Sequence, residues 1–176
     1  MPDRPSNLTR RRFLKSAARA GAALAVPCVL PGSALGRDGA VAPGDRITLG
    51  GLGLGGRGTG DLGCFMRNPD VQFLAICDVR RQRREAIKAM VDKRYGNQDC
   101  ATYRNMHEFL ARPDIDAVLI ATGDRWHTMA SITAAKAGKD IYCEKPCSMT
   151  IQESRALADV VNLYGRIYQA GTQRRS

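Results

Sequence analysis

The stretch from Arg46 to Asp61 reads RITLGGLGLGGRGTGD: a short apolar run, a glycine cluster and the start of a segment that favours helix. The pattern G-x-G-x-x-G fits it in two overlapping registers, which begin at Gly51 and Gly53. The second register leaves residues 47–52 as a strand of ordinary length. It also places three later apolar side chains on one face of the following helix: Leu62, Phe65 and Met66. We therefore expect a strand, a glycine turn and a helix, in that order.

This turn has the features of a phosphate-binding loop. Gly53 would make the tight turn, Gly55 would let the backbone approach a pyrophosphate, and Gly58 would let helix and strand pack closely. Backbone N–H groups and the positive end of the helix dipole would then meet the phosphates. Because seven glycines lie between residues 50 and 60, a flexible loop is the alternative. The predicted cofactor contacts of this turn are Gly53, Leu54, Gly55, Gly56, Arg57 and Gly58.

An acidic residue follows at the spacing that a dinucleotide site requires. The run VQFLAIC from Val71 to Cys77 is almost continuously apolar, as in a parallel strand buried on both faces. Asp78 comes next, twenty residues beyond Gly58, where a carboxylate accepts hydrogen bonds from an adenosine ribose. Its alternative role is to cap the next helix. A carboxylate there favours NAD, although the neighbouring Arg80 and Arg81 could accommodate NADP.

The rest of the chain alternates between expected helices and strands, without a hairpin signal. This favours an α/β fold with a doubly wound parallel sheet. Its strand ends at Gly53, Asp78, Thr122 and Glu144 should share one edge, where ligands bind. The expected helices are 80–95, a short one after Asn105, 125–136 and a capped one from Thr150 to Leu163. The expected further strands are 101–103, 117–121, 140–143 and 166–170.

The leading 36 residues differ from the rest in composition. They hold six basic residues and one acid, with TRRRFLK at Thr9–Lys15 before a small-residue and apolar stretch. This resembles a twin-arginine (Tat) export signal, with a membrane anchor or an amphipathic helix as alternatives. We expect a signal at 1–36, a linker at 37–45 and one domain at 46–176. An exported, for example periplasmic, protein would then carry a cofactor bound before export.

Charge and cysteine content exclude several classes of site. A large part of the formal charge of +10 lies in the leading segment, and the remaining basic residues are scattered without a nucleic-acid-binding motif. We therefore expect no nucleic-acid partner and no stable membrane span. The cysteines lack metal-ligand spacing, and the chain has only two histidines. Cys143 and Cys147 could pair or bind a metal, but we predict no metal site.

Several motifs together resemble one known family. They are GLGLGGRGTG, CDV at Cys77–Val79, ATGDRWH at Ala121–His127, GKDIYCEKP at Gly138–Pro146 and GTQRRS at Gly171–Ser176. In this order they are similar to the glucose-fructose oxidoreductase/inositol dehydrogenase family (Gfo/Idh/MocA). The resemblance covers about residues 46 to 176. It implies a Rossmann domain followed by a second α/β domain with the sugar site, which is absent from this chain.

The resemblance also implies roles for individual residues. The lysine of the Glu-Lys-Pro motif, Lys145, would be the catalytic residue that polarises a substrate hydroxyl beside the nicotinamide; a surface lysine on a turn is the alternative. Gly123 and Arg125 depart from the usual family motif. His127 could instead start a helix with no catalytic task. The implied cofactor contacts outside the glycine turn and Asp78 are Ala121, Thr122, Trp126, His127, Glu144 and Lys145.

These observations lead to one functional expectation with two alternatives. The chain would be the cofactor-binding part of an exported NAD(P)-dependent oxidoreductase that transfers hydride from a sugar or polyol. Its partners would be that substrate and the Tat export machinery, and a full-length form could assemble as a homo-oligomer. The alternatives are a glycosidase that uses bound NAD for transient oxidation, and a non-catalytic dinucleotide-binding fragment.

Overall fold

The structure is a computed structural model that describes residues 41–175. The predicted export signal lies outside the described residues. The predicted linker reaches them only at its end, where Pro43–Asp45 form the 3-10 turn η2. No helix within the described part is both long enough and apolar enough to cross a membrane.

One parallel sheet of six strands organises the domain, in the order β3-β2-β1-β4-β5-β6. This confirms the doubly wound α/β fold expected from the alternating pattern. The strands are β1 (Ile47–Leu52), β2 (Val71–Cys77), β3 (Ala101–Tyr103), β4 (Ala117–Ile120), β5 (Asp140–Glu144) and β6 (Tyr168–Gly171). The strand order reverses between β1 and β4, next to the glycine turn.

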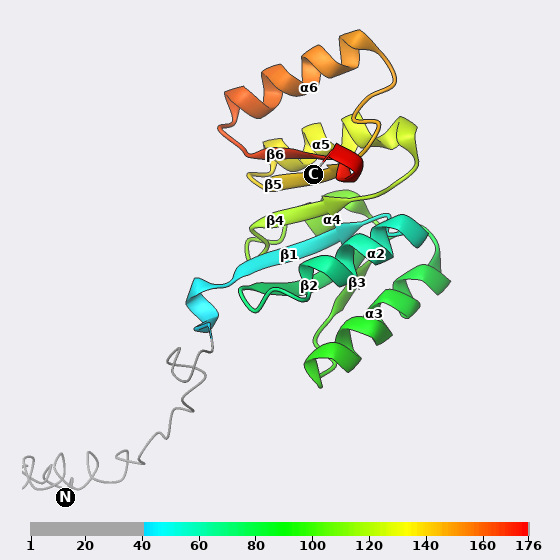
Figure 1. The fold of residues 1–176 in the computed structure, drawn as a ribbon, viewed down its shortest axis with the longest axis vertical. Helices are drawn as coiled ribbons and strands as arrows, with labels where there is room; N and C mark the ends of the chain where they lie inside the picture. Colours follow the sequence, from blue (N-terminus) through cyan, green and yellow to red (C-terminus); the bar gives the residue numbers. More distant parts are fainter. Residues whose placement is uncertain (1–40, 176) are drawn as a thin grey trace, which may run out of the picture.

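Helices cover both faces of the sheet (Figure 1). They are α2 (Gly56–Phe65), α3 (Arg81–Tyr95), α4 (Met106–Leu110), α5 (His127–Lys136) and α6 (Ile151–Leu163). One hydrophobic cluster joins α2 and α3 to the sheet through side chains such as Leu62 and Ile87. A second cluster joins α4, α5 and α6 to the other face through Phe109, Ala134 and Leu157. The two clusters enclose the strands, as their nearly continuous apolar sequences require.

Local sequence signals account for most element ends. Gly96, Gly138 and Gly165 have φ of 68°, 77° and 59°, the left-handed conformation expected where a helix stops at glycine. Thr150 forms a capping box with Glu153 at the start of α6, as predicted. Asn105 caps α4 by accepting a hydrogen bond from the N–H of His107.

Several predicted boundaries were wrong by one or two residues; two of them are the end of β4, at Ile120 instead of 121, and the start of α3, at Arg81 instead of 80. The strand expected at 166–170 runs from Tyr168 to Gly171, because the N–H of Arg166 is still bonded to the carbonyl of Val161 at the end of α6. The strand expected at 140–143 extends through Glu144, which pairs with Gly171 of β6. A 3-10 turn, Asp124–Trp126, occupies the start of the helix expected at 125, so α5 begins at His127.

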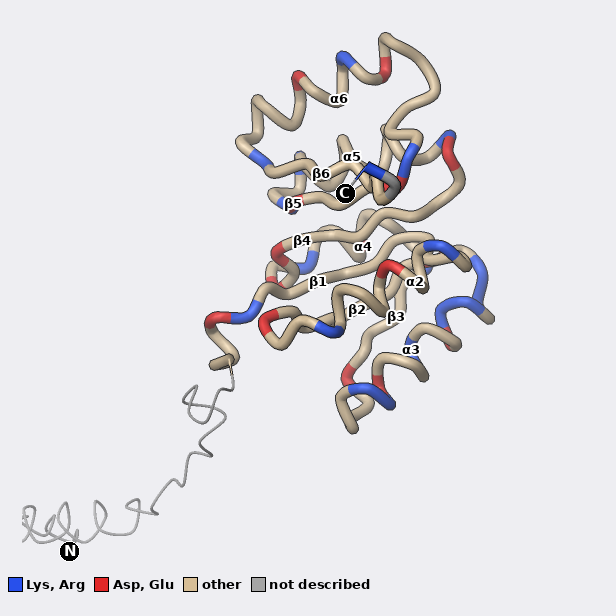
Figure 2. The backbone as a smooth tube through the Cα atoms, in the orientation of Figure 1, with Lys and Arg blue, Asp and Glu red and all other residues tan. Residues whose placement is uncertain are grey.

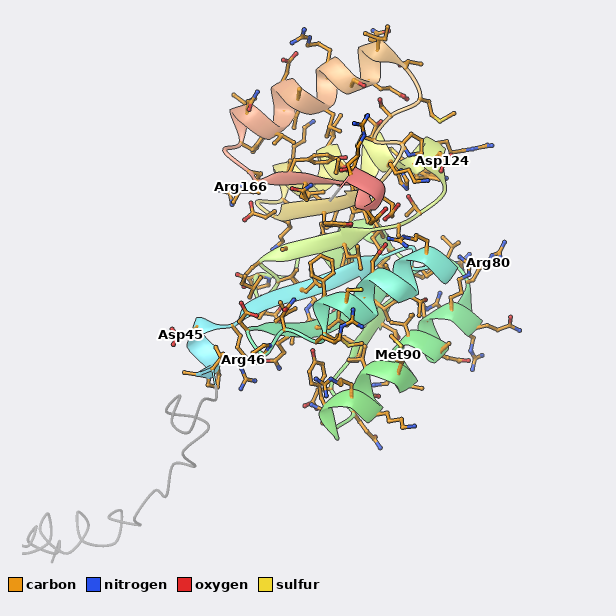
Figure 3. The ribbon with its side chains drawn as sticks, in the orientation of Figure 1. Asp45, Arg46, Arg80, Met90, Asp124 and Arg166 are labelled. Carbon is orange, nitrogen blue, oxygen red and sulfur yellow. The ribbon has the colours of Figure 1, made fainter. Side chains whose placement is uncertain are left out.

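All six strands run in one direction, so their carboxyl ends meet at a single edge. Figure 3 shows the labelled residues Arg80 and Asp124 at this edge, where loops leave β2 and β4. Asp45, Arg46 and Arg166 lie at the opposite edge, where strands begin. The polar turn residues predicted to form a site therefore meet on one side of the domain.

Candidate functional site

A cavity of about 750 Å³ opens at the carboxyl edge, next to the reversal of strand order. It lies among the ends of β1, β2 and β4 and the start of α2. The structure brings most of the predicted contacts to it. The predicted residues that line it are Gly53, Gly55, Gly56, Arg57, Gly58, Asp78, Ala121, Thr122 and Trp126.

Two glycines shape the floor of this cavity. Gly53 has a φ of 69°, a left-handed conformation that allows the chain to turn sharply after β1. A Cβ atom on Gly58 would lie 2.6 Å from the Cβ of Ala121, so only glycine lets α2 pack this closely against the end of β4. The glycine pattern is therefore an ordered turn, and the flexible-loop alternative is wrong.

The start of α2 presents unpaired backbone donors to the cavity. Its N-cap residue is Gly55, which has no side chain to accept hydrogen bonds from the first helical N–H groups. These groups and the helix dipole favour an anion at this point. Since no side chain fills the space in front of Gly56, the turn fits a pyrophosphate.

Asp78 lies at the end of β2, on the wall of the same cavity. The residue is 7% exposed, and its Oδ1 atom accepts a hydrogen bond from the N–H of Arg80 at 2.8 Å. No hydrogen bond from the described residues reaches its Oδ2 atom. One oxygen therefore fixes the turn before α3, and the other is available to a ribose hydroxyl.

Positive side chains surround Asp78, and they include two that the sequence analysis missed. Arg80, Arg83 and Arg104 line the cavity. Arg81 does not: its Nε atom is 2.6 Å from Glu85 Oε1, and its side chain is 82% exposed. Figure 2 shows Lys and Arg gathered at the beginning of α3, on the side of the domain where α2 starts. The spacing of the arginines after Asp78 could have indicated Arg83, because residues three apart, such as Arg80 and Arg83, lie on one side of a helix.

Lys145 lies in a second cavity, of about 650 Å³, rather than in the first. It is exposed at the end of β5, and its neighbours there include Thr172, Gln173 and Arg175. Arg57 lines both cavities. The predicted catalytic lysine is therefore next to the glycine turn, with the Arg57 side chain between the two spaces.

Glu144 forms a buried carboxyl pair with Asp61 and does not line the first cavity. Its Oε1 atom accepts hydrogen bonds from Arg57 Nε, at 3.4 Å, and from the Gln173 amide. Burial, followed by the hydrogen bond with Glu144, raises the pKa of Asp61 to about 6. Burial acts to raise the pKa of Glu144 too, but hydrogen bonds from Asp61, Gln173 and Arg57 outweigh it and lower that pKa. Asp61 therefore keeps its proton to a higher pH than Glu144 does.

Two further predicted contacts also lie away from the first cavity. His127 is 1% exposed, with Nδ1 2.6 Å from the Pro146 carbonyl oxygen and Nε2 3.1 Å from that of Thr122. Its ring connects the end of β4 to the turn that contains Lys145. The Leu54 side chain is 2% exposed and packs with α2 and α3. Burial of these side chains depends on tertiary packing, which the motifs do not encode.

Comparison with known proteins identifies the family. Residues 47–172 match the family described as "Oxidoreductase family, NAD-binding Rossmann fold" (GFO_IDH_MocA). The chain belongs to the Gfo/Idh/MocA oxidoreductase family. This confirms the family resemblance and makes the described domain an NAD(P)-binding Rossmann domain. The glycine turn, Asp78 and the first cavity fit that cofactor.

Three proteins show how Gfo/Idh/MocA members relate to this chain. A glycosyl hydrolase family 109 protein of Saccharopolyspora erythraea is 29% identical over 89% of this chain and 37% of its own length. An NAD-binding protein from Listeria innocua is 28% identical, with a TM-score of 0.64 over 74% of this chain and 36% of that one. A myo-inositol 2-dehydrogenase from Lactobacillus plantarum is 26% identical, with a TM-score of 0.65 over 74% of this chain and 37% of that one.

The chain therefore spans little more than a third of the length of these relatives. The Gfo/Idh/MocA match ends at residue 172, within the Rossmann domain. Among residues 41–175 there is no group of three or more His, Cys, Asp or Glu side chains that could hold a metal ion.

Proposed function

We propose that this chain is the cofactor-binding part of an exported NAD(P)-dependent oxidoreductase that acts on the CH–OH group of a sugar or polyol. The observation that carries the proposal is the position of Arg57 between two cavities. One cavity holds the glycine turn and Asp78, and the other holds Lys145. A cofactor bound in the first would end close to the second. The name of the Lactobacillus relative, an inositol dehydrogenase, supports a polyol substrate.

In this function, the residues of the chain would bind and orient the cofactor and polarise the substrate hydroxyl. The N–H groups at the start of α2 would hold the pyrophosphate, and Asp78 would accept hydrogen bonds from the adenosine ribose. The nicotinamide ring, when bound, supplies the hydride acceptor. The Lys145 ammonium would donate a hydrogen bond to the substrate hydroxyl and favour its ionised form. The base that removes the proton would come from outside this chain.

A second candidate function has support from the curated relatives. The Saccharopolyspora protein is named as a glycosyl hydrolase of family 109, and other relatives from Shewanella carry the same name. A glycosidase with bound NAD would oxidise and then reduce its substrate, without net NADH formation. The Glu144-Lys145-Pro146 turn at the second cavity favours the dehydrogenase for this chain.

Export rests on the leading segment alone. The paired Arg10 and Arg11, followed by Phe13 and Leu14, resemble a Tat signal. A fusion of residues 1–45 to a folded reporter tests this part of the proposal. Export of the reporter should stop when both arginines are replaced by lysine, and retention of the reporter by the unchanged segment would contradict it.

Binding and turnover test the remainder separately. The purified chain should enhance NADH fluorescence on titration, and Asp78→Ala should reduce its preference for NADH over NADPH. A form extended to the length of the relatives should reduce NAD with a polyol, and Lys145→Ala should abolish turnover while NADH affinity stays the same. Lys136→Ala, an exposed lysine on α5, is the matched control. Release of sugar without NADH would favour the glycosidase.

A further inference from the structure

Arg83 reaches from α3 to the glycine turn. It is the third residue of α3, and its Nη1 atom lies 3.0 Å from the position that a Cβ atom on Gly55 would occupy. The Cζ and Nη2 atoms of the same guanidinium are within 3.8 Å of that point. The group therefore covers the glycine at which the backbone would approach a phosphate.

Arg83 differs from the other arginines of α3 in its contacts. Arg81 is paired with Glu85, Arg84 donates to the carbonyl of Asp78, and Arg94 donates to the carbonyl of Met66. Within residues 41–175, Arg83 has no acceptor and no carboxylate partner. A guanidinium carries five N–H donors in a fixed plane. Those of Arg83 are therefore free to bind a ligand in the cavity that it lines.

Two sets of donors thus line the same cavity. One set is the N–H groups at the start of α2, which have no side-chain cap at Gly55. The other is the guanidinium of Arg83, which extends from α3. Both sets favour an anion, and the paired geometry of a guanidinium suits phosphate oxygens. Asp78 lines the same cavity, and its Oδ1 atom accepts a hydrogen bond from the N–H of Arg80.

We propose that Arg83 donates hydrogen bonds to the cofactor pyrophosphate and closes the glycine turn over it. The inference rests on the proposed function, since the pyrophosphate belongs to the bound dinucleotide. Arg80 and Arg104 also line the cavity and follow the ends of β2 and β3, but the guanidinium that lies against Gly55 is that of Arg83. Arg83 is therefore a cofactor-binding residue that acts on NAD and NADP alike.

Titration of the purified full chain with three ligands tests this assignment. NADH and NADPH are followed by fluorescence, and ADP-ribose, which has the pyrophosphate but no nicotinamide, by calorimetry. The variants are Arg83→Met, which removes the charge at similar length, and Arg83→Lys, which keeps it. Arg81→Met is the matched control, because Arg81 lies on the same helix, is exposed and does not line the cavity. Circular dichroism checks that each variant is folded.

The inference predicts one pattern of affinities. Arg83→Met should raise the Kd of all three ligands by a similar factor, about tenfold or more. The Kd values of Arg83→Lys should lie between those of Arg83→Met and the wild type. Those of Arg81→Met should stay within about twofold of the wild type. Unchanged affinity in Arg83→Met, or a loss confined to NADPH, would overturn the assignment. Failure of the wild-type chain to bind any dinucleotide would instead overturn the proposed function, and the inference with it.

Discussion

Arg57 and Glu144 are 87 residues apart in sequence, yet Arg57 Nε lies 3.4 Å from Glu144 Oε1. The contact joins the helix that follows the glycine turn to the strand that carries Lys145. Arg57 also pairs with Asp61, one helical turn later, at 2.8 Å. The buried carboxyl groups of Asp61 and Glu144 therefore share one exposed cation, and the protonation of Asp61 should affect stability.

The stability of the domain should depend on pH through Asp61. Burial raises its pKa to about 6, whereas an aspartate in an unfolded chain has a pKa of about 3.9. Between about pH 4 and pH 6 the folded state holds more protons, so this contribution to stability is present at low pH and is lost as the pH rises. Urea unfolding followed by circular dichroism measures the free energy of unfolding of Asp61→Asn and of the wild type. The value for Asp61→Asn minus that for the wild type should increase by about 1 to 3 kcal/mol as the pH rises through this window.

Asp159→Asn provides the control, because Asp159 is exposed on α6. Its stability should follow that of the wild type across the same pH range. A constant difference between Asp61→Asn and wild type would show that Asp61 titrates in the folded chain as it does in the unfolded one.

Gly58 should tolerate no larger residue. A Cβ atom there would lie 2.6 Å from Ala121 Cβ and 3.0 Å from Leu54 Cδ2, so Gly58→Ala should cost about 1 to 3 kcal/mol in unfolding free energy and weaken NADH binding. Gly60, on the same helix, has no atom within 4 Å of its Cβ position. Gly60→Ala should stabilise the chain by about 0.5 to 1 kcal/mol. Chemical denaturation of both variants measures the contrast, and equal effects would contradict the close packing.

His127 should stabilise the fold rather than contact the cofactor. Removal of its buried ring leaves a cavity and takes away the ring N–H that donates to one of two neighbouring carbonyl oxygens, those of Thr122 and Pro146. His127→Ala should therefore cost about 2 to 4 kcal/mol in unfolding free energy. The measurement is thermal and urea unfolding without cofactor. A variant of normal stability that binds NADH poorly would support the direct contact predicted from the motif.

Lys139 should anchor the opposite edge of the sheet. Its Nζ atom is 2.6 Å from the Arg112 carbonyl oxygen and 2.8 Å from that of Ile115, and burial lowers its pKa. Lys139→Met should cost about 1 to 3 kcal/mol, since two carbonyl groups lose their donor. Lys136→Met, at an exposed site three residues earlier, should change stability by less than about 0.5 kcal/mol. Urea unfolding of both variants tests the difference.

Signals within a few residues were sufficient for most of the fold. The glycine turn after β1, the capping box at Thr150 and the left-handed Gly96, Gly138 and Gly165 all match their predicted positions. Each depends on the backbone conformation of one residue or on hydrogen bonds within one turn. The boundary of β6 was less predictable, because its start depends on pairing with β5.

The sequence by itself determined the parallel sheet, the edge where its strands end and the glycine turn, because strand and helix periodicity and glycine conformation are local properties. Only the tertiary structure decided which side chains meet at that edge. It turned Glu144 toward Arg57, buried His127 between two loops and brought Arg83 over Gly55. These contacts depend on the relative placement of helices and strands far apart in the chain, which packing of the two hydrophobic clusters fixes.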